Sequence, residues 1–338
     1  MDNKLYIQLK DEIDISSIDA LCRSISAVGP YVSTLAVQNE FLSQRLTFYK
    51  LASNRRRAYR QFKIHKKSGG FRIIRAPKKE LKQILTCLNF ILSSVYTPPK
   101  EVIGFVCGKS VRDNALCHLN KNYVLNLDLQ DFFPSISARM VEQSLTRINV
   151  EPFVARLIAE VCTIPEDKKA SNRCYLPQGA PTSPVLSNIF CKMLDQRLVG
   201  LAKRFHVDYT RYADDMTFSS NHNVYQLDGE FMQELRRIIE ENNLSLNPTK
   251  TRLLKRGTRQ EVTGLTVGEK VNVSRTYVKN LRALIHTIAL SPTIDNHKLN
   301  VAYGKLNYLR MIKGKSDSTY RTLCIKLNLA LRGKHIQK

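Results

Sequence analysis

Residues 123–128 (YVLNLD) and residues 208–218 (DYTRYADDMTF) are the two stretches of sequence that decide the fold. The first is an apolar run that ends in an acid, which is typical of a buried strand. In the second, the pair Asp214-Asp215 separates two short runs rich in aromatic and other apolar residues. That pattern predicts a hairpin of two strands with the acid pair at its turn. We therefore expect strands that carry Asp128, Asp214 and Asp215.

The segments around these strands show the periodicity of helices. Apolar residues recur at three- and four-residue spacing within residues 11–50, until Gly29-Pro30 interrupts the pattern. Residues 184–204 and 229–242 show the same spacing. The mixed order of helices and strands predicts an α+β fold, in which helices pack on one face of a small sheet.

The segment 54–82 is strongly basic, with Glu80 as its single acid. Within it, residues 63–77 (KIHKKSGGFRIIRAP) alternate around Gly69-Gly70, which predicts a β-hairpin whose arms carry cations. A helix over residues 79–93 is expected to follow. A hairpin of this kind could fold over a phosphate group.

The overall charge points to a polyanionic partner. The chain has 338 residues, of which 43% are hydrophobic, so it can bury a sizeable core. It carries 53 Lys and Arg against 29 Asp and Glu, a formal net charge of +24. Nucleic acid is the partner that this excess favours, while an anionic membrane surface or a merely cationic protein are the alternatives.

The chain lacks the features of a membrane or a disulfide-rich protein. The first ten residues (MDNKLYIQLK) contain no basic segment followed by an apolar run, and no stretch approaches the ~18 apolar residues of a membrane span. We therefore expect a soluble cytoplasmic protein. The eight cysteines form no C-x-x-C pair, which argues against a zinc site or a disulfide framework. We expect them to be small core residues in a reducing compartment.

The acids of the two predicted strands suit metal chemistry. Adjacent aspartates on a largely apolar hairpin repel each other unless a cation neutralises them, and hard carboxylate oxygens suit Mg²⁺. Two such ions about 3.5–4 Å apart stabilise both the attacking hydroxyl and the leaving pyrophosphate oxygen of a phosphoryl transfer. Taken alone, an Asp-Asp pair is usually a solvated turn, so the neighbouring sequence has to decide.

Three motifs, in this order along the chain, favour metal binding by the Asp-Asp pair, because they resemble the motifs of reverse transcriptases. They are residues 128–135 (DLQDFFPS), residues 176–184 (LPQGAPTSP) and residues 212–215 (YADD). The resemblance implies a right-hand polymerase with an N-terminal helical region (1–50), fingers and an antiparallel palm sheet packed by helices (51–270), and a basic helical thumb (271–338). It also implies that Asp128, Asp214 and Asp215 are catalytic, and that they and Leu129 bind two Mg²⁺ ions.

The same resemblance assigns nucleotide contacts. Residues 66–77 are similar to the fingers motif, in which Arg72 matches the arginine that binds the triphosphate. Residues 247–251 (NPTKT) are similar to a palm motif with Lys250 at the basic position near the phosphates. Gln178 and Gly179 would pack against the nascent base pair, with glycine allowing close approach. The other cations of these segments are expected to be solvated surface charges.

Phe133 occupies the position of an aromatic steric gate. A bulky ring beneath the sugar excludes a 2′-hydroxyl, which makes DNA the expected product from deoxynucleoside triphosphates. If the segment is extended, side chains alternate between its two faces. Of Phe132 and Phe133, one ring should then face the core and the other the site.

Two shorter matches resemble the signatures of retron reverse transcriptases: residues 114–118 (NALCH) and residues 262–264 (VTG). They make Asn114, His118, Val262, Thr263 and Gly264 candidates for RNA binding. The alternative is structural, with His118 as a core or capping residue and the tripeptide as a strand end.

Retron resemblance implies specific partners. A structured non-coding RNA would serve as template and, through the 2′-hydroxyl of an internal guanosine, as primer. The product would be a branched RNA-linked DNA (msDNA). The complex would act in antiphage defence together with a separately encoded effector protein.

The C-terminal segment 271–338 is basic, with Asp295 and Asp317 as its acids. That is too few carboxylates for the metal site of a ribonuclease H domain. The cations favour a thumb that contacts duplex backbone, and the interleaved tyrosines either stack on RNA bases or pack in the thumb core. The positions of these tyrosines are 277, 303, 308 and 320.

Two other functions remain as alternatives. A group II intron-like or diversity-generating reverse transcriptase is one, although the former usually carries further regions that this chain would lack. An inactive RNA-binding scaffold is the other. It is disfavoured because a scaffold does not need three mutually repelling aspartates.

Overall fold

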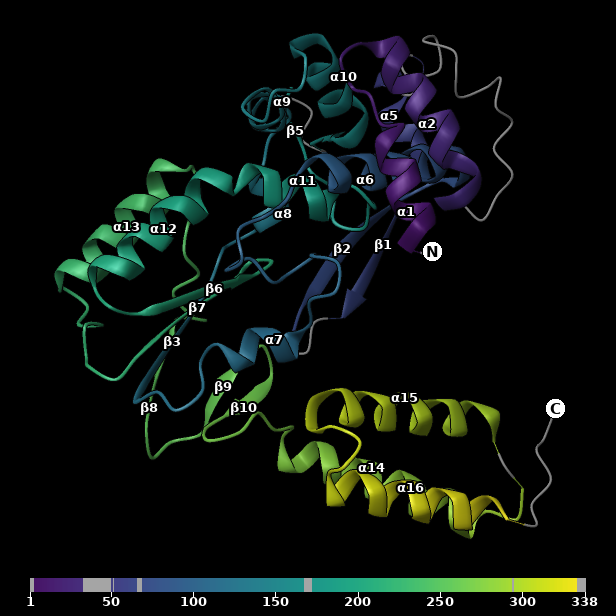
Figure 1. Cartoon of the computed structure of the whole chain (residues 1–338), viewed down its shortest axis with the longest axis vertical. Coiled ribbons are helices and arrows are strands. Elements are labelled where there is room, and N and C mark those ends of the chain that lie inside the picture. Colours follow the sequence, from purple (N-terminus) through teal and green to yellow (C-terminus); the bar gives the residue numbers. More distant parts are fainter. Residues whose placement is uncertain are drawn as a thin grey trace. The chain divides into compact units, whose positions relative to one another are not determined.

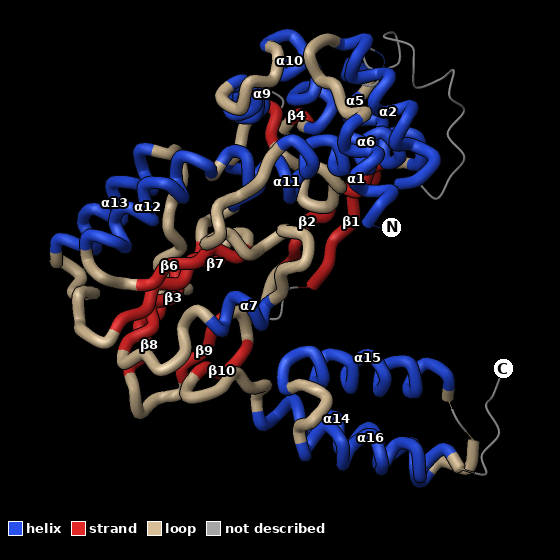
Figure 2. The backbone as a smooth tube through the Cα atoms, viewed as in Figure 1, coloured by secondary structure: helices blue, strands red, loops and turns tan. Residues whose placement is uncertain are grey.

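A computed structural model describes residues 3–32, 50, 52–65, 69–166, 172–293 and 295–332 (Figures 1 and 2). Contacts between Cα atoms divide the chain into two compact units. The first comprises residues 1–106, 129–199 and 234–247, and the second residues 107–128, 200–233 and 248–338. This division cuts across the expected boundaries of fingers, palm and thumb, which remain a prediction.

The first unit is mainly helical. Its elements are α1 (Asn3–Asp11), α2 (Ile18–Val32), α5 (Arg55–Ala58), β1 (Tyr59–His65), β2 (Phe71–Pro77), α6 (Lys79–Val95), α8 (Phe132–Ser135), α9 (Ala138–Thr146), α10 (Pro152–Cys162), β4 (Ile164–Pro165), β5 (Cys174–Tyr175) and α11 (Ser183–Phe190). Two more helices, α12 (Lys192–Arg204) and α13 (Glu230–Glu241), continue from this unit into the other.

Helices α2 and α6 form the core of the first unit. Both are amphipathic, and their buried faces include Leu21 and Ile25 on α2, and Ile84 and Leu88 on α6. The predicted interruption at Gly29-Pro30 is wrong, because α2 continues to Val32. Proline is tolerated there because it removes only one backbone hydrogen bond in the last turn. Residues 33–49, which belong to the expected helical region, lie outside the described residues.

The basic hairpin is confirmed. Strands β1 and β2 are antiparallel, with His65 opposite Phe71 and Tyr59 opposite Pro77. The turn contains Gly69 and Gly70, both at positive φ, where glycine has no steric penalty. Lys66 and Lys67 of the predicted fingers motif fall outside the described residues. Helix α6 follows as expected and is two residues longer than predicted.

The second unit contains a four-stranded antiparallel sheet in the order β6-β7-β3-β8. Its strands are β3 (Tyr123–Asp128), β6 (Asp208–Tyr212), β7 (Asp215–Ser220) and β8 (Arg252–Lys255). The predicted strands are therefore confirmed, and the fold is α+β. Residues directly opposite on neighbouring antiparallel strands share a face of the sheet, so the register fixes which side chains lie together.

The two faces of this sheet differ in polarity. One face is apolar, and Phe218 on β7 packs there against Phe231 in the first turn of α13, with ring centroids 5.3 Å apart. The other face carries hydroxyl and amide groups, and Thr217 Oγ1 donates a hydrogen bond to Asn126 Oδ1 at 3.1 Å. Asn126 Nδ2 in turn donates to the backbone carbonyl of Glu261 at 2.8 Å. The hairpin that contains Glu261 therefore covers the polar face.

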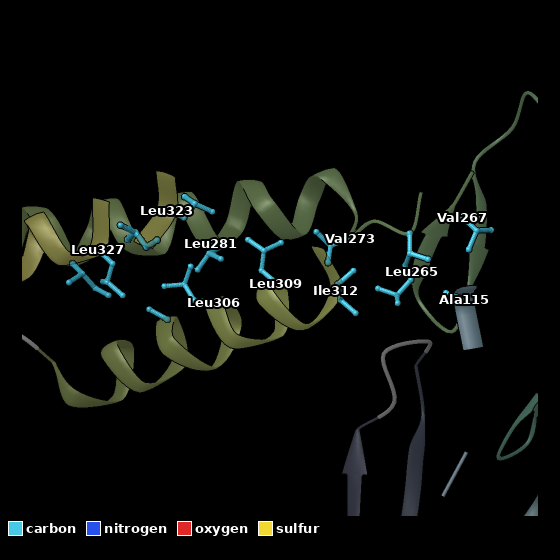
Figure 3. Close-up of a cluster of buried hydrophobic side chains, with 14 of the residues drawn as sticks. Ala115, Leu265, Val267, Val273, Leu281, Leu306, Leu309, Ile312, Leu323 and Leu327 are labelled. Carbon is cyan, nitrogen blue, oxygen red and sulfur yellow. The ribbon is translucent and has the colours of Figure 1, made fainter. Parts of the chain in front are cut away.

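The rest of the second unit surrounds one apolar cluster (Figure 3). Its elements are α7 (Val111–Leu116), β9 (Gln260–Val262), β10 (Leu265–Val267), α14 (Arg275–Leu290), α15 (Asn296–Lys313) and α16 (Ser318–Leu331). Ala115 from α7 and Leu265 from β10 join the leucines of the three C-terminal helices in this cluster. Arg112 Nε adds a hydrogen bond to the carbonyl of Ile312 at 3.1 Å. The basic C-terminal segment is thus a helical bundle fixed to α7 and β9–β10.

The cysteines follow the prediction only in part. All eight are free, and Cys22, Cys87, Cys162 and Cys191 are buried. Cys107 and Cys117 are exposed, so the expectation that all are core residues is wrong for these two. Within the described part of the chain, none of the helices is long and apolar enough to cross a membrane.

Candidate active site

The turn between β6 and β7 carries the acid pair. Tyr212 pairs with Asp215, so the loop consists of Ala213 and Asp214 only. Ala213 has a φ of 60°, a left-handed conformation that a two-residue hairpin usually gives to glycine or asparagine. This two-residue turn places Asp214 at its tip and Asp215 at the first position of β7.

Arg211 holds this turn in place, and the sequence analysis did not identify it. The side chain is fully buried, and its Nη1 donates a hydrogen bond to the carbonyl of Ala213 at 3.0 Å. A buried guanidinium needs hydrogen-bond acceptors, and the backbone of the turn supplies one. The available signal was a cation inside the predicted strand, between Thr210 and Tyr212.

The sheet register brings two of the predicted catalytic acids together. Asp128, the last residue of β3, lies directly opposite Asp215, the first residue of β7. Their side chains therefore share the polar face, and Asp214 follows in the adjoining turn. Asp128 is 6% exposed. Its Oδ1 accepts a hydrogen bond from Lys250 Nζ at 2.7 Å.

The charges at this end of the sheet influence one another. The pKa of Asp215 is raised to about 7, first by desolvation and then by the negative charges of Asp214 and Asp128, while Lys250 opposes the shift. The pKa of Lys250 is raised, mainly by its hydrogen bond to Asp128. Three acids thus crowd one site that holds one neutralising lysine.

The donor set fits a divalent cation. Asp128, Asp214 and Asp215 offer hard oxygen ligands whose mutual repulsion a cation would relieve. Among the described residues no three metal-ligating side chains are yet arranged around one position, and Asp128 accepts its hydrogen bond from Lys250. Leu129 has an aliphatic side chain without a donor atom, so only its backbone carbonyl could serve as the fourth predicted ligand.

The predicted nucleotide contacts other than Lys250 belong to the first unit. Arg72 is exposed on β2, opposite Ile64. The 176–184 segment lies against the same strand, because Arg75 N donates to the carbonyl of Gln178 at 2.8 Å. Gly179 has a φ of 119°, and a Cβ there would lie 2.8 Å from Ile74 Cγ2. Glycine is therefore required for contact with β2, and the nucleotide contacts of Gln178 and Gly179 stay predictions.

Phe132 and Phe133 have the predicted exposures for a different reason. Phe132 is buried and Phe133 is partly exposed, but the segment is the short helix α8 and not an extended strand. Asp131 enters this helix with a φ of 44°. Phe133 contacts Phe105, with ring centroids 6.2 Å apart, and keeps one side open to solvent. Its role as steric gate remains a prediction.

Asn114 and His118 of the 114–118 segment make internal contacts in this fold. Asn114 is 1% exposed and His118 is 0% exposed, so neither side chain offers a surface to RNA. The two ring nitrogens of His118 lie 2.7 Å from Ser219 Oγ and 2.7 Å from Thr210 Oγ1. The ring of His118 therefore contacts the polar face of the sheet, as in the core alternative, and its role in RNA binding stays a prediction.

Residues 262–264 are divided between core and surface. Val262 is buried in the apolar cluster, so direct RNA contact by its side chain is also excluded. Thr263 and Gly264 form the two-residue turn between β9 and β10, with φ values of 47° and 80°. Asn114 Nδ2 donates to Thr263 Oγ1 at 3.4 Å, which joins the two short motifs. Thr263 and Gly264 remain candidates for RNA contact.

The tyrosines of the C-terminal helices are mostly packing residues. Tyr277 donates a hydrogen bond to the carbonyl of Lys305 at 2.9 Å and packs against Tyr308. Tyr320 is partly buried against the apolar cluster. Tyr303 is 43% exposed and is the one of the four that is free to stack on a base.

Known proteins similar to this chain share one description. Residues 64–283 match the family described as reverse transcriptase (RNA-dependent DNA polymerase). The chain is 36% identical to the retron Mx65 reverse transcriptase of Myxococcus xanthus over 270 residues, which cover 76% of this chain and 62% of that protein. It is 35% identical to the retron Mx162 reverse transcriptase of the same organism over 255 residues, which cover 68% of this chain and 52% of that protein.

A third relative is matched over most of its length. The chain is 32% identical to the retron Ec86 reverse transcriptase of Escherichia coli over 276 residues, which cover 80% of this chain and 81% of that protein. The chain thus spans about half to four fifths of these relatives. Among solved structures, telomerase from Candida albicans in complex with a telomeric RNA fragment aligns with 95% of this chain and 77% of that chain, at 13% identity and a TM-score of 0.43.

Proposed function

Because the chain belongs to the reverse transcriptase family and, within it, to the retron reverse transcriptases, we propose that it is an RNA-directed DNA polymerase. The observation that carries the proposal is the register that sets Asp128 opposite Asp215, with Asp214 in the adjoining turn. Reverse transcriptases use divalent metal ions. Here Asp128, Asp214, Asp215 and the carbonyl of Leu129 would hold two Mg²⁺ ions.

When bound, Mg²⁺ ions stabilise the attacking hydroxyl and the leaving pyrophosphate oxygen. The chain's own residues do the rest. Arg211 keeps the turn of Asp214 and Asp215 in position through the carbonyl of Ala213. Lys250 neutralises Asp128 in this conformation, and its ammonium group would turn to the triphosphate when a cation takes over that carboxylate.

The nucleotide would be selected by residues of the first unit. Arg72 offers a bidentate guanidinium to the triphosphate, and its exposure on β2 leaves it free to do so. Phe133 would exclude a 2′-hydroxyl by the volume of its ring. Gln178 and Gly179 would pack beside the nascent base pair. The substrates are therefore deoxynucleoside triphosphates and the product is DNA.

We further propose the retron reaction for this chain. A structured non-coding RNA would be both template and primer, with an internal guanosine 2′-hydroxyl as the first nucleophile, so the product is branched msDNA. The helices α14, α15 and α16 form a basic thumb that would contact duplex backbone. The complex would work in the cytoplasm, in antiphage defence, with a separately encoded effector protein.

The catalytic assignment is tested with the double variant Asp214→Asn/Asp215→Asn. We expect primer extension on an annealed RNA template to disappear while RNA affinity stays nearly unchanged, because affinity depends on many cations. Asp228→Asn, an exposed aspartate of the second unit, is the control and should keep full activity. Extension by the double variant at a rate near that of the native protein would refute the assignment.

The retron reaction is tested separately from polymerase activity. The native protein should extend an annealed primer on any RNA, but should start synthesis without a primer only on its own structured RNA. Sequencing the nucleic acid that copurifies with the protein identifies that RNA. Copurified DNA without a covalent branch to RNA would contradict this part of the proposal.

A further inference from the structure

A cavity of about 630 Å³ lies in the first unit and shares none of the polymerase residues described above. Helices α5, α9 and α10 and the start of β5 form its walls. Four arginines line it, each from a different segment, against two glutamates: Arg55, Arg139, Arg156, Arg173, Glu142 and Glu160. Four arginines and two glutamates leave the lining with a net formal charge of +2 (4 − 2), which a bound anion would neutralise.

The surroundings leave much of this positive charge available. Arg55 is held by neutral acceptors, since its Nε donates to the carbonyl of Ala52 at 2.7 Å and its Nη1 to Thr163 Oγ1 at 3.4 Å. Thr163 is able to accept because its own hydroxyl donates to the carbonyl of Ala159. The guanidinium is thereby oriented without being neutralised.

The two exposed arginines on α9 and α10 differ in their partners. Arg139 is exposed and has no ion pair or hydrogen bond with any described residue. Arg156 pairs with Glu160 one turn further along α10, with Nε 3.3 Å from Oε1, and both side chains remain solvent-accessible. An exposed pair of this kind contributes little stability, so Arg156 can exchange Glu160 for another anion at small cost.

The start of α9 adds to the same field. Ser137 caps this helix by accepting a hydrogen bond from Met140 N, so the backbone N–H groups of Ala138 and Arg139 have no partner within the helix. Ser137, Ala138 and Arg139 all line the cavity. The positive end of the helix dipole therefore lies at the same cavity as the arginines.

Phosphate is the anion that this chemistry suits, because guanidinium groups bind its oxygens in pairs. Two features favour the backbone of an RNA strand over a free nucleotide. Arg139 and Arg156 of its lining are exposed, so a strand can reach them, and the described residues that line the cavity include no aromatic ring on which a base could stack. A site without base contacts binds phosphate independently of sequence.

We propose that this arginine cavity binds the phosphate backbone of RNA at a place distinct from the polymerase centre. The chemistry of binding stands by itself, and the identity of the RNA as a retron template rests on the proposed function. Phosphate at this place fixes the RNA on the first unit without taking part in nucleotide addition.

The test is RNA binding by the double variant Arg139→Gln/Arg156→Gln. A labelled oligouridine is titrated with protein at several salt concentrations and the fluorescence anisotropy is followed. Each lost arginine–phosphate contact should lower the slope of log affinity against log salt by about one. Arg147→Gln is the matched control, because Arg147 is exposed at the other end of α9 and does not line the cavity.

A variant of opposite sign separates a binding role from a structural one. Glu160→Gln removes the acid that pairs with Arg156, so RNA should bind more tightly and the salt slope should steepen. Inorganic tripolyphosphate, added as competitor, should displace oligouridine from the native protein more effectively than from the double variant.

Three outcomes decide the proposal. A lower salt slope in the double variant and a higher affinity in Glu160→Gln support it. RNA affinity equal to that of Arg147→Gln overturns it. Loss of tripolyphosphate binding with unchanged RNA affinity also overturns it, because the cavity then takes free polyphosphate. Extension of an annealed primer at saturating template should be unchanged, which keeps this result independent of the catalytic assignment.

Discussion

His118 gives the sharpest stability prediction, because it is a fully buried titratable group with two close hydroxyl contacts. Its ring lies between Ser219 Oγ and Thr210 Oγ1, each at 2.7 Å. Burial lowers the pKa of His118 from 6.5 to about 4. Asp208 raises this pKa and Lys121 lowers it, and the two residues form an ion pair with each other.

The sign of the pH effect follows from the lowered pKa. Between about pH 4 and pH 6.5 the unfolded chain binds a proton at His118 and the folded chain does not. The contribution of the neutral ring to stability is therefore complete above pH 6.5 and is lost as the pH falls toward 4. A pKa difference of this size corresponds to about 3 kcal/mol in the free energy of unfolding.

The assay is urea unfolding at several pH values between about 4 and 7, compared with the variant His118→Asn. Asparagine does not titrate, so the variant should lose about 3 kcal/mol less than the native protein over this range. At neutral pH it should be less stable by about 1–3 kcal/mol, since one buried hydroxyl loses its partner. His206→Asn is the control, because His206 is exposed at positive φ, where asparagine is well tolerated.

The result that would refute this reasoning is equal pH dependence of His118→Asn and the native protein. A direct NMR titration of His118 with an ordinary pKa near 6.5 would refute it as well.

Three further variants probe the site. Phe133→Ala should admit ribonucleotides in a single-nucleotide extension assay, and unchanged rejection would move the steric gate to another residue. Arg211→Met should lower the extension rate by about 10²-fold at unchanged RNA affinity, because the turn that carries Asp214 loses its buried hydrogen bond; a native rate would refute this. Thr263→Asn should raise the free energy of unfolding by about 1 kcal/mol, since asparagine suits the positive φ at this position. Reduced self-primed synthesis in the same variant would show that Thr263 contacts RNA.

The strands and hairpins could be predicted because their signals are local. Apolar runs, the acid pair of the turn and the glycines at positions 69 and 70 are each contained within a few residues. The helix α8 could not be found in this way. Asp131 adopts a φ of 44° and turns the chain into a short helix where alternation suggested an extended segment.

The burial of the short motifs could not be predicted because it depends on distant contacts. The partners of His118 are Thr210 and Ser219, which are far away in sequence and come together only through the sheet register. Arg211 was missed for a related reason. A cation in a strand suggests solvent, and only the turn at Ala213 shows why a guanidinium is buried there.

The two short motifs make sense as one structural unit. Asn114 contacts Thr263 across the base of the apolar cluster, and Val262 and Leu265 on either side of the turn are buried in it. The chain that follows α7 reaches His118, whose ring contacts the polar face of the sheet. Asp128 and Asp215 lie opposite each other at one end of that face. Thr263 is β-branched, and its φ of 47° is unfavourable for such a residue. Asparagine or glycine would be lower in energy at this position. Since α14, α15 and α16 pack in the same cluster, a displacement of the turn would reach both these helices and the sheet. An effect of these motifs on self-primed synthesis would therefore act through the turn at Thr263 and Gly264 or through α14, α15 and α16, and not through direct contact of His118 with RNA.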